Sequence, residues 1–242
     1  MAETRLHCRH ALLPGGWASN VLLELDQEGV ITSVCRDANS DDATRLQGFL
    51  IPGMPNLHSH GFQHLMAGRT GPSPGGEDHF WSWRKQMYRL ARFLDPQQYE
   101  DCLAWVYLQM LRAGYTACAE FHYLHHQPDG QPYADPAEMS RRVLAAAQRA
   151  GMPLTLLPVL YCRSGFEADI VEPPQRRFRL DAEGYVRLIE DCGLAVDGNS
   201  MQKVGMAPHS LRAVPGELIR ELAQLTGGGQ PVHIHIAEQR QE

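Results

Sequence analysis

Two histidine pairs, each with one residue between its members, are the sequence feature with the clearest chemical potential. His58-Ser59-His60 follows one apolar stretch, and His233-Ile234-His235 lies within another. Because successive side chains of a β-strand point to opposite faces, histidines two positions apart point the same way. Two imidazoles aimed at one point are typical of a Zn²⁺ site, which needs at least a third protein ligand.

A carboxylate follows the second pair. Glu238 lies three positions after His235, where it can reach a metal-activated water without binding the metal. That is the position of a general acid/base. Taken singly, each histidine pair also fits hydrogen-bonded core or turn histidines, with Glu238 on the surface. Two such pairs at the same edge of one sheet favour the metal site.

A third segment, His209-Ser210-Leu211-Arg212, joins a histidine to a guanidinium. Such a cation near a strand end suits a substrate carboxylate. By itself, Arg212 fits an ordinary surface ion pair or helix cap equally well.

The elements that must position these residues alternate between strands and helices. Nine of the twelve histidines lie at or just beyond the carboxyl ends of the expected strands. Unalternated apolar strands separated by helices predict a parallel sheet covered on both faces, either doubly wound or a (β/α)8 barrel. No GxGxxG follows the first strand, which disfavours dinucleotide binding. Strands are expected to begin near residues 51, 116, 154, 203 and 231, with helices over 80–93, 96–113, 135–150, 181–192 and 215–225.

The domain organisation changes near residue 48. Residues 1–48 predict a small β-structure, with a turn over Asp26–Gly29, and residues 49–242 carry the strand–helix alternation. Gly and Pro residues over 71–76 indicate a loop that can act as a lid.

Composition narrows the class of protein. The 242 residues include 28 acidic and 22 Lys/Arg side chains, a net charge of -6, which disfavours nucleic acid as a partner. No apolar run approaches the roughly 18–20 residues that span a bilayer, and no membrane association is expected. Charged residues near the N-terminus exclude a signal peptide, and six scattered cysteines without a CxxC pair favour a cytoplasmic protein.

Longer motifs carry a family resemblance. Residues Pro52–His60 and His233–Glu238 resemble the two histidine strands of the amidohydrolase superfamily. Finer similarity, over nearly the whole chain, is to its N-formimino-L-glutamate deiminases. The segments that carry it include Phe62-Gln63, Phe80–Arg84, Glu120–His126, Leu156–Tyr161, Gln175–Phe178 and His209–Arg212.

The resemblance implies a chemistry for these residues. It implies a TIM-like (β/α)8 metal-dependent hydrolase barrel with one Zn²⁺ per subunit, bound by His58, His60 and His235. Metal-bound hydroxide would attack the formimino carbon of the substrate, with Glu238 as general acid/base. The products would be N-formyl-L-glutamate and ammonia, as in histidine degradation. The glutamate portion of the substrate, a dicarboxylate, would be held by Gln63, Arg84, Tyr123, His209 and Arg212.

The same resemblance implies a homodimer and a barrel longer than this chain. Five strands are expected here, so the barrel is truncated after about the fifth strand, without the family's metal-binding Asp and sixth-strand His. An isolated half barrel is expected to be inactive or unstable, because its edges are unpaired.

Three alternatives stay open. Another amidohydrolase deaminase, acting on guanine or a related amidine, would share both histidine pairs. A truncated remnant would only bind metal. Three nitrogen ligands and a carboxylate suit Zn²⁺, but they leave Fe²⁺ and Mn²⁺ open.

Overall fold

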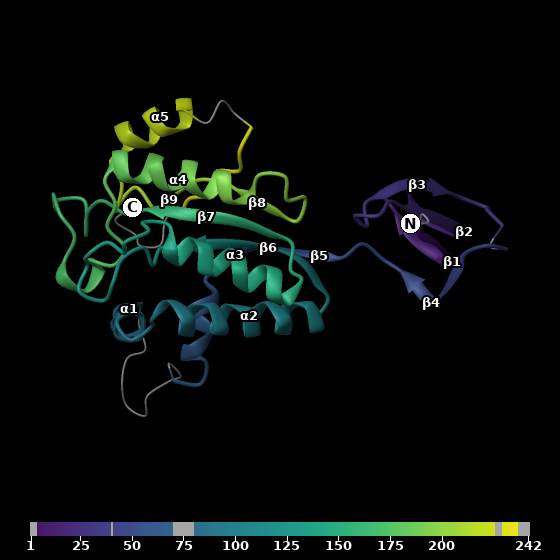
Figure 1. Ribbon diagram of the computed structural model, residues 1–242, viewed down its shortest axis with the longest axis horizontal. Coiled ribbons are helices and arrows are strands. Elements are labelled where there is room, and N and C mark those ends of the chain that lie inside the picture. Colours follow the sequence, from purple (N-terminus) through teal and green to yellow (C-terminus); the bar gives the residue numbers. More distant parts are fainter. Residues whose placement is uncertain (1–3, 40, 70–79, 226–228, 237–242) are drawn as a thin grey trace. The chain divides into compact units, whose positions relative to one another are not determined.

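The computed structural model describes residues 4–39, 41–69, 80–225 and 229–236. The chain divides into two compact units, Met1–Met54 and Pro55–Glu242. Each unit has its own hydrophobic core, and the strands of each pair only within that unit (Figure 1).

The first unit is a four-stranded sheet in the order β3-β2-β1-β4. Strand β1 pairs antiparallel with β2 and parallel with β4, and β2 pairs antiparallel with β3. The predicted turn is confirmed: the Asp26 carboxylate accepts hydrogen bonds from the N–H groups of Glu28 and Val30, at 3.0 and 2.8 Å. The strands are β1 (Thr4–Leu13), β2 (Gly16–Leu25), β3 (Ile31–Cys35) and β4 (Thr44–Leu50).

The second unit alternates strands with helices, as predicted. In chain order its elements are β5 (Met54–Ser59), η1 (Gly61–Met66), α1 (Phe80–Ala91), α2 (Pro96–Arg112), β6 (Tyr115–His122), α3 (Glu138–Ala150), β7 (Leu154–Leu160), η2 (Pro173–Gln175), α4 (Ala182–Val196), β8 (Gln202–Val204), β9 (Ala207–Pro208) and α5 (Gly216–Leu225). In Figure 1 the helices run alongside the strands, with α2 and α3 next to each other.

The sheet follows the order β5-β6-β7-β8, with β9 also on β7. Strand β7 is parallel to β6, β8 and β9. All but one residue of β7 are buried, which matches the unalternated apolar sequence expected of a strand covered on both faces. Parallel strands bring their carboxyl ends to the same edge, which positions the histidines.

Local sequence signals explain both ends of α2. The Asp95 side chain accepts the Gln98 N–H at 2.8 Å and begins α2, with Pro96 in its first turn. Gly114, at φ 93°, follows its end. The predicted start of α3 at Asp135-Pro136 is wrong, because the helix begins at Glu138. The Asp135 carboxylate accepts a hydrogen bond of 2.9 Å from the Ala137 N–H, and this contact forms a turn before the helix.

The strands predicted to begin near residues 203 and 231 are wrong as continuous strands. The first is divided into β8 and β9 around Gly205 and Met206. Within the described residues, the second forms only two bridges, Met206 with Val232 and Ser210 with His235. A Cβ on Gly205 would lie 2.5 Å from the Pro231 carbonyl oxygen, so the two segments approach too closely for any other residue there. This close crossing interrupts the regular ladder.

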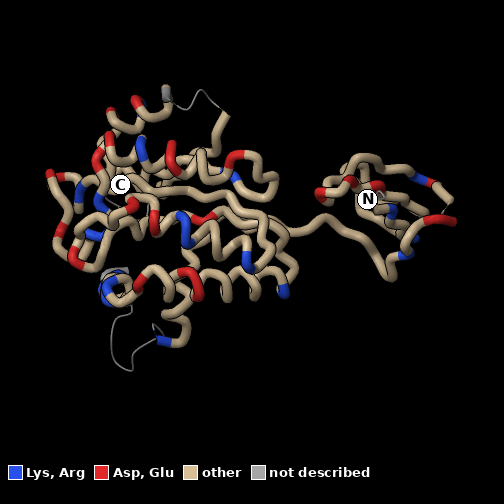
Figure 2. The backbone as a smooth tube through the Cα atoms, viewed as in Figure 1, with Lys and Arg blue, Asp and Glu red and all other residues tan. Residues whose placement is uncertain are grey.

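Ion pairs join α2 to α3. Glu100 is 8% exposed and accepts hydrogen bonds from Arg142 at 3.0 Å and Arg149 at 2.8 Å. Arg149 also pairs with Asp101 at 2.7 Å. Figure 2 shows basic and acidic residues interspersed along the backbone. Within the described residues, no helix combines the length and apolar character needed to cross a bilayer.

Candidate metal centre

Three imidazole rings converge at the carboxyl edge of the sheet. The Nε2 atoms of His58 and His60 are 3.1 Å apart, those of His60 and His235 are 3.3 Å apart, and those of His235 and His58 are 3.1 Å apart. The three atoms form a nearly equilateral triangle, although His235 is 175 positions from His60 in the chain. These are the three histidines expected to share a metal ion.

Different backbone elements deliver these rings. His58 is in β5, whereas His60 lies just beyond its end, in the turn that begins η1. The His235 N–H donates to the His209 carbonyl at 2.9 Å, which holds the residue beside the end of β9. His233 comes from the same segment but does not join the group of three.

The surroundings favour the neutral form of His60 and of His58. Burial, followed by the nearby His235 and His58, lowers the pKa of His60 to about 3. Burial also lowers the pKa of His58. His60 Nδ1 lies 3.1 Å from the Phe121 carbonyl, which accepts from it. That contact fixes the tautomer and leaves the Nε2 lone pair facing the other two rings.

The donor set fits a divalent cation. Tetrahedral zinc with Zn–N bonds of about 2.0–2.1 Å places neighbouring ligand nitrogens roughly 3.3–3.4 Å apart. The observed separations of 3.1–3.3 Å are close to that range. Three imidazole nitrogens that share a single focus therefore have the geometry of a metal's protein ligands. Glu238 and the 71–76 loop lie outside the described residues.

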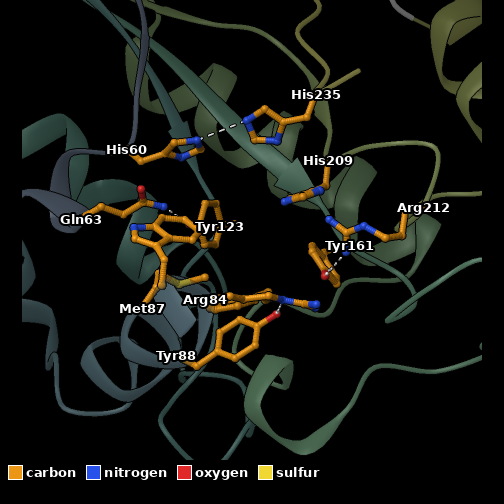
Figure 3. Close-up of a pocket in the computed structure, with 12 residues that line it drawn as sticks. His60, Gln63, Arg84, Met87, Tyr88, Tyr123, Tyr161, His209, Arg212 and His235 are labelled. Atoms are coloured by element: carbon orange, nitrogen blue, oxygen red, sulfur yellow. Dashed lines mark hydrogen bonds between the residues drawn. The ribbon is translucent and has the colours of Figure 1, made fainter. Parts of the chain in front are cut away.

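A pocket extends from the histidines (Figure 3). His60 and His235 are at one end, and Arg84 and Tyr88 are at the other. The pocket is lined by His60, Gln63, Trp83, Arg84, Met87, Tyr88, Tyr123, Tyr161, Phe178, His209, Arg212 and His235. The structure thus brings together all five residues expected to hold a substrate.

Their contacts tie these five residues into the pocket wall. The Gln63 amide donates to the Tyr123 hydroxyl, and Arg84 donates to the Tyr88 hydroxyl. Arg212 is 8% exposed, and its Nη1 donates to the Tyr161 hydroxyl at 3.4 Å. The arginines come from α1 and from the turn after β9, so only the fold brings them together.

His209 lies between the two ends of the pocket. Its ring centre is 4.9 Å from that of His235 and 4.7 Å from that of Tyr161. Burial, with the nearby His235 and Arg212, lowers the pKa of His209 well below its ordinary value. A neutral imidazole here, with Nδ1 3.0 Å from the Ser210 hydroxyl, offers one hydrogen-bond partner to a ligand.

Sequence reasoning assigned no role to several residues around this site. Tyr88, Tyr161 and the buried Gln175 form a hydrogen-bonded group at the pocket. Glu120 is fully buried beneath the turn after His60. Tyr161, Gln175 and Glu120 lie in family-like segments, but a buried glutamine or glutamate there has no spacing signal that indicates its partners.

Other histidines near the strand ends do not join the centre. The His122 Nδ1 is 2.9 Å from the Tyr99 hydroxyl, and the His125 Nε2 is 2.8 Å from the Val159 carbonyl. Burial is the main cause that lowers the pKa of both. Their placement is that of core histidines, which confirms that position near a strand end alone does not make a ligand.

Parallel strands with three histidines converging at their carboxyl ends are typical of metal-dependent α/β-barrel proteins. The amidohydrolase family profile matches residues 49–242, so the chain belongs to the amidohydrolase family. The profile described as "Formimidoylglutamate deiminase HutF, N-terminal domain" matches residues 3–48.

Similar sequences include a formimidoylglutamate deiminase from Pseudomonas aeruginosa. It is 47% identical over 98% of this chain and 52% of its own length. A 5-methylthioadenosine/S-adenosylhomocysteine deaminase from Shouchella clausii is 23% identical over 89% of this chain and 45% of its own length. The chain spans about half the length of these relatives.

Solved structures share the fold. An amidohydrolase from Brucella melitensis has a TM-score of 0.92 and 46% identity, over 99% of this chain and 53% of its own. An adenosine deaminase from Xanthomonas campestris with bound zinc has a TM-score of 0.68 and 17% identity, over 100% of this chain and 51% of its own. The expectation of an amidohydrolase barrel fold is confirmed.

Proposed function

We propose that the protein hydrolyses N-formimino-L-glutamate to N-formyl-L-glutamate and ammonia, a step of histidine degradation. The observation that carries the proposal is a pocket with three converging imidazoles at one end and two arginines around the rest. A substrate with an amidine at one end and carboxylates at the other matches this distribution. The similarity to the Pseudomonas aeruginosa formimidoylglutamate deiminase supports the same substrate.

His58, His60 and His235 would hold one Zn²⁺ through their Nε2 atoms, with Fe²⁺ and Mn²⁺ as alternatives. A divalent cation in such a site supplies activated water at neutral pH. The low pKa of His60 keeps its nitrogen available as a ligand.

The residues of this chain would then position the substrate and move protons. Arg84 and Arg212 bind its carboxylates, and Gln63, Tyr123 and His209 orient the rest of the molecule. Water oxygen adds to the formimino carbon while Glu238 takes the water proton. Glu238 then passes that proton to the formimino nitrogen, and the remaining hydroxyl proton moves to the same nitrogen as the C–N bond breaks, which releases ammonia and leaves the formyl carbonyl.

A second candidate is another deaminase of the family, acting on guanine or a related amidine. The similar structures include an adenosine deaminase and a guanine deaminase. Against this candidate, a neutral heterocycle has no carboxylate to accept hydrogen bonds from Arg84 and Arg212.

The proposal includes the division into a β-unit at 1–48 and a barrel portion at 49–242, with a homodimer in the cytoplasm and no nucleic-acid or membrane partner. The profile matches at 3–48 and 49–242 support the division.

The test is ammonia release from N-formimino-L-glutamate, compared with guanine, by the protein as its gene encodes it. We expect release from the first substrate only, and loss of release in Glu238→Gln. Bound zinc without release from either substrate would reject the enzyme and support a remnant that only binds metal. Release from guanine alone would establish the second candidate.

A further inference from the structure

Gln175 connects two tyrosines that line the pocket. It is the last residue of η2 and is completely buried. Its Nε2 donates to the Tyr88 hydroxyl at 3.0 Å and to the Tyr161 hydroxyl at 2.8 Å. One amide group therefore reaches two elements that are far apart in sequence, α1 and the end of β7.

The orientation of this amide is determined by its other contact. The Glu172 backbone N–H donates to Gln175 Oε1 at 2.9 Å. Because a backbone N–H can only donate, the atom it meets must be the oxygen, and the opposite atom must be the NH₂ group. Both amide hydrogens are then used, one on each tyrosine.

Each tyrosine oxygen also accepts from an arginine. Arg84 Nε donates to Tyr88, and Arg212 Nη1 donates to Tyr161 at 3.4 Å. The guanidinium and amide N–H groups can only donate, so both contacts on each phenol oxygen use its lone pairs. The hydroxyl hydrogen of each tyrosine must therefore point to a different acceptor. In the described part of the chain, neither hydroxyl makes a further hydrogen bond.

The surroundings favour a negatively charged acceptor. Among the described residues, those that line the pocket include two arginines and no acidic side chain. Figure 3 shows Arg84 and Tyr88 at the end away from His60 and His235, with Tyr161 between that end and His209. Burial raises the pKa of Tyr88, so its hydroxyl keeps its hydrogen and remains a donor.

We propose that Gln175 is a positioning residue that turns the hydroxyl hydrogens of Tyr88 and Tyr161 toward a carboxylate of the ligand. The ligand carboxylate would then receive hydrogen bonds from two neutral hydroxyl groups as well as from the two guanidinium groups. Only the identity of the ligand rests on the proposed function; the arrangement of donors itself favours a carboxylate over the corresponding amide.

The experiment measures glutarate and glutaramide binding by calorimetry to the metal-free protein as its gene encodes it. Gln175→Met has nearly the volume of glutamine but no donors. We expect it to weaken glutarate binding about tenfold or more, and to change glutaramide binding much less. Gln202→Met is the matched control, because Gln202 is also buried but donates to the Leu144 carbonyl at 2.8 Å, outside the pocket.

A double-mutant cycle separates positioning from general packing. In the Tyr88→Phe/Tyr161→Phe protein, Gln175→Met should cause no further loss of glutarate affinity, because the hydroxyls through which it acts are absent. The tyrosine variant alone should show the same selective loss, which tests the proposal even if Gln175→Met does not fold. Equal losses for glutarate and glutaramide, or full additivity, would overturn the inference.

Ammonia release from N-formimino-L-glutamate is measured separately from glutarate affinity. Selective glutarate loss in a protein that releases no ammonia would reject the proposed function and leave the role of Gln175 in place. Unchanged glutarate affinity in an active enzyme would reject the role of Gln175 alone.

Discussion

The buried carboxylate of Glu120 accepts a hydrogen bond of 2.7 Å from the backbone N–H of Gly61, the residue that follows His60. The next residue of β6, Phe121, accepts from the His60 ring. Two neighbouring residues of one strand thus hold both the backbone and the side chain of a candidate ligand. Burial raises the pKa of Glu120, and the Gly61 N–H opposes that rise.

This relationship predicts that Glu120 supports metal affinity without touching the metal. Glu120→Met removes the acceptor and should lower zinc affinity about 10–100-fold, the usual effect of losing a supporting contact. Glu120→Gln keeps an acceptor oxygen, so it should lower zinc affinity less than Glu120→Met does. Competition with a chromophoric chelator measures the affinities. Equal affinities for Glu120→Met and the unchanged protein would contradict the prediction.

The histidine triangle predicts which histidines bind the metal. His60→Ala should abolish stoichiometric zinc, because two imidazoles are too few protein ligands for a stable site. His64→Ala is the control: His64 is only four positions away, but its ring packs on Trp105 and is not in the triangle. Metal content after dialysis, measured by atomic emission, distinguishes the two. Full zinc occupancy in His60→Ala would exclude the assignment.

The space around Gly61 predicts a packing effect. A Cβ there would lie 2.5 Å from Leu103 Cδ2 and 3.3 Å from a Glu120 carboxylate oxygen. Gly61→Ala should therefore destabilise the protein by about 1–3 kcal/mol. Gly193→Ala, in α4 with nothing beyond the local helix backbone within 4 Å of the added carbon, should stabilise by about 0.4–1 kcal/mol. Denaturant unfolding of both variants checks the opposite signs; the same sign in both would refute the packing argument.

The position of Arg212 predicts a substrate-binding defect. Arg212→Met should lower kcat/KM for N-formimino-L-glutamate about 10–100-fold, as expected for losing hydrogen bonds to a charged group. Arg187→Met, on the exposed side of α4 where Arg187 pairs with Glu183, should leave kcat/KM unchanged. Steady-state assays of ammonia release compare the two. A defect of equal size in both variants would mean that Arg212 is not specific for the substrate.

The ion pairs of Glu100 predict a pH-dependent contribution to stability. Hydrogen bonds from Arg149 and Arg142 lower the pKa of this carboxyl below 4.5, its ordinary value. A lowered folded-state pKa means that the stabilisation is present above about pH 4.5 and is lost as pH falls through the folded-state value.

Glu100→Gln should therefore cost about 1–2 kcal/mol at pH 7, and the difference from the unchanged protein should shrink below about pH 4. Urea unfolding at a series of pH values measures the difference. A constant difference from pH 7 to pH 3 would show that the charge of Glu100 plays no part.

Much of the fold was predictable because its signals are local. The Asp95-Pro96 start and Gly114 end of α2, and the turn at Asp26, depend on contacts within four residues. Such contacts are encoded by neighbouring residue types. The interrupted strand after Gly205 was not predictable, because it results from the approach of Pro231, which is distant in the sequence.

The sequence by itself determined which side chains are available for chemistry: two histidine pairs at strand ends, and the arginines Arg84 and Arg212. It also determined the strand–helix alternation that directs strand ends to one edge of the sheet. The spacing of these residues leaves open which of them meet; the family resemblance indicated His58, His60 and His235, and only the tertiary structure brings those three rings together. His235 joins His58 and His60, whereas His122 and His125 pack into the core, and Gln175 joins two distant tyrosines. The physical reason is that periodicity specifies which face a side chain takes, whereas its partner across the fold depends on how all the elements pack together.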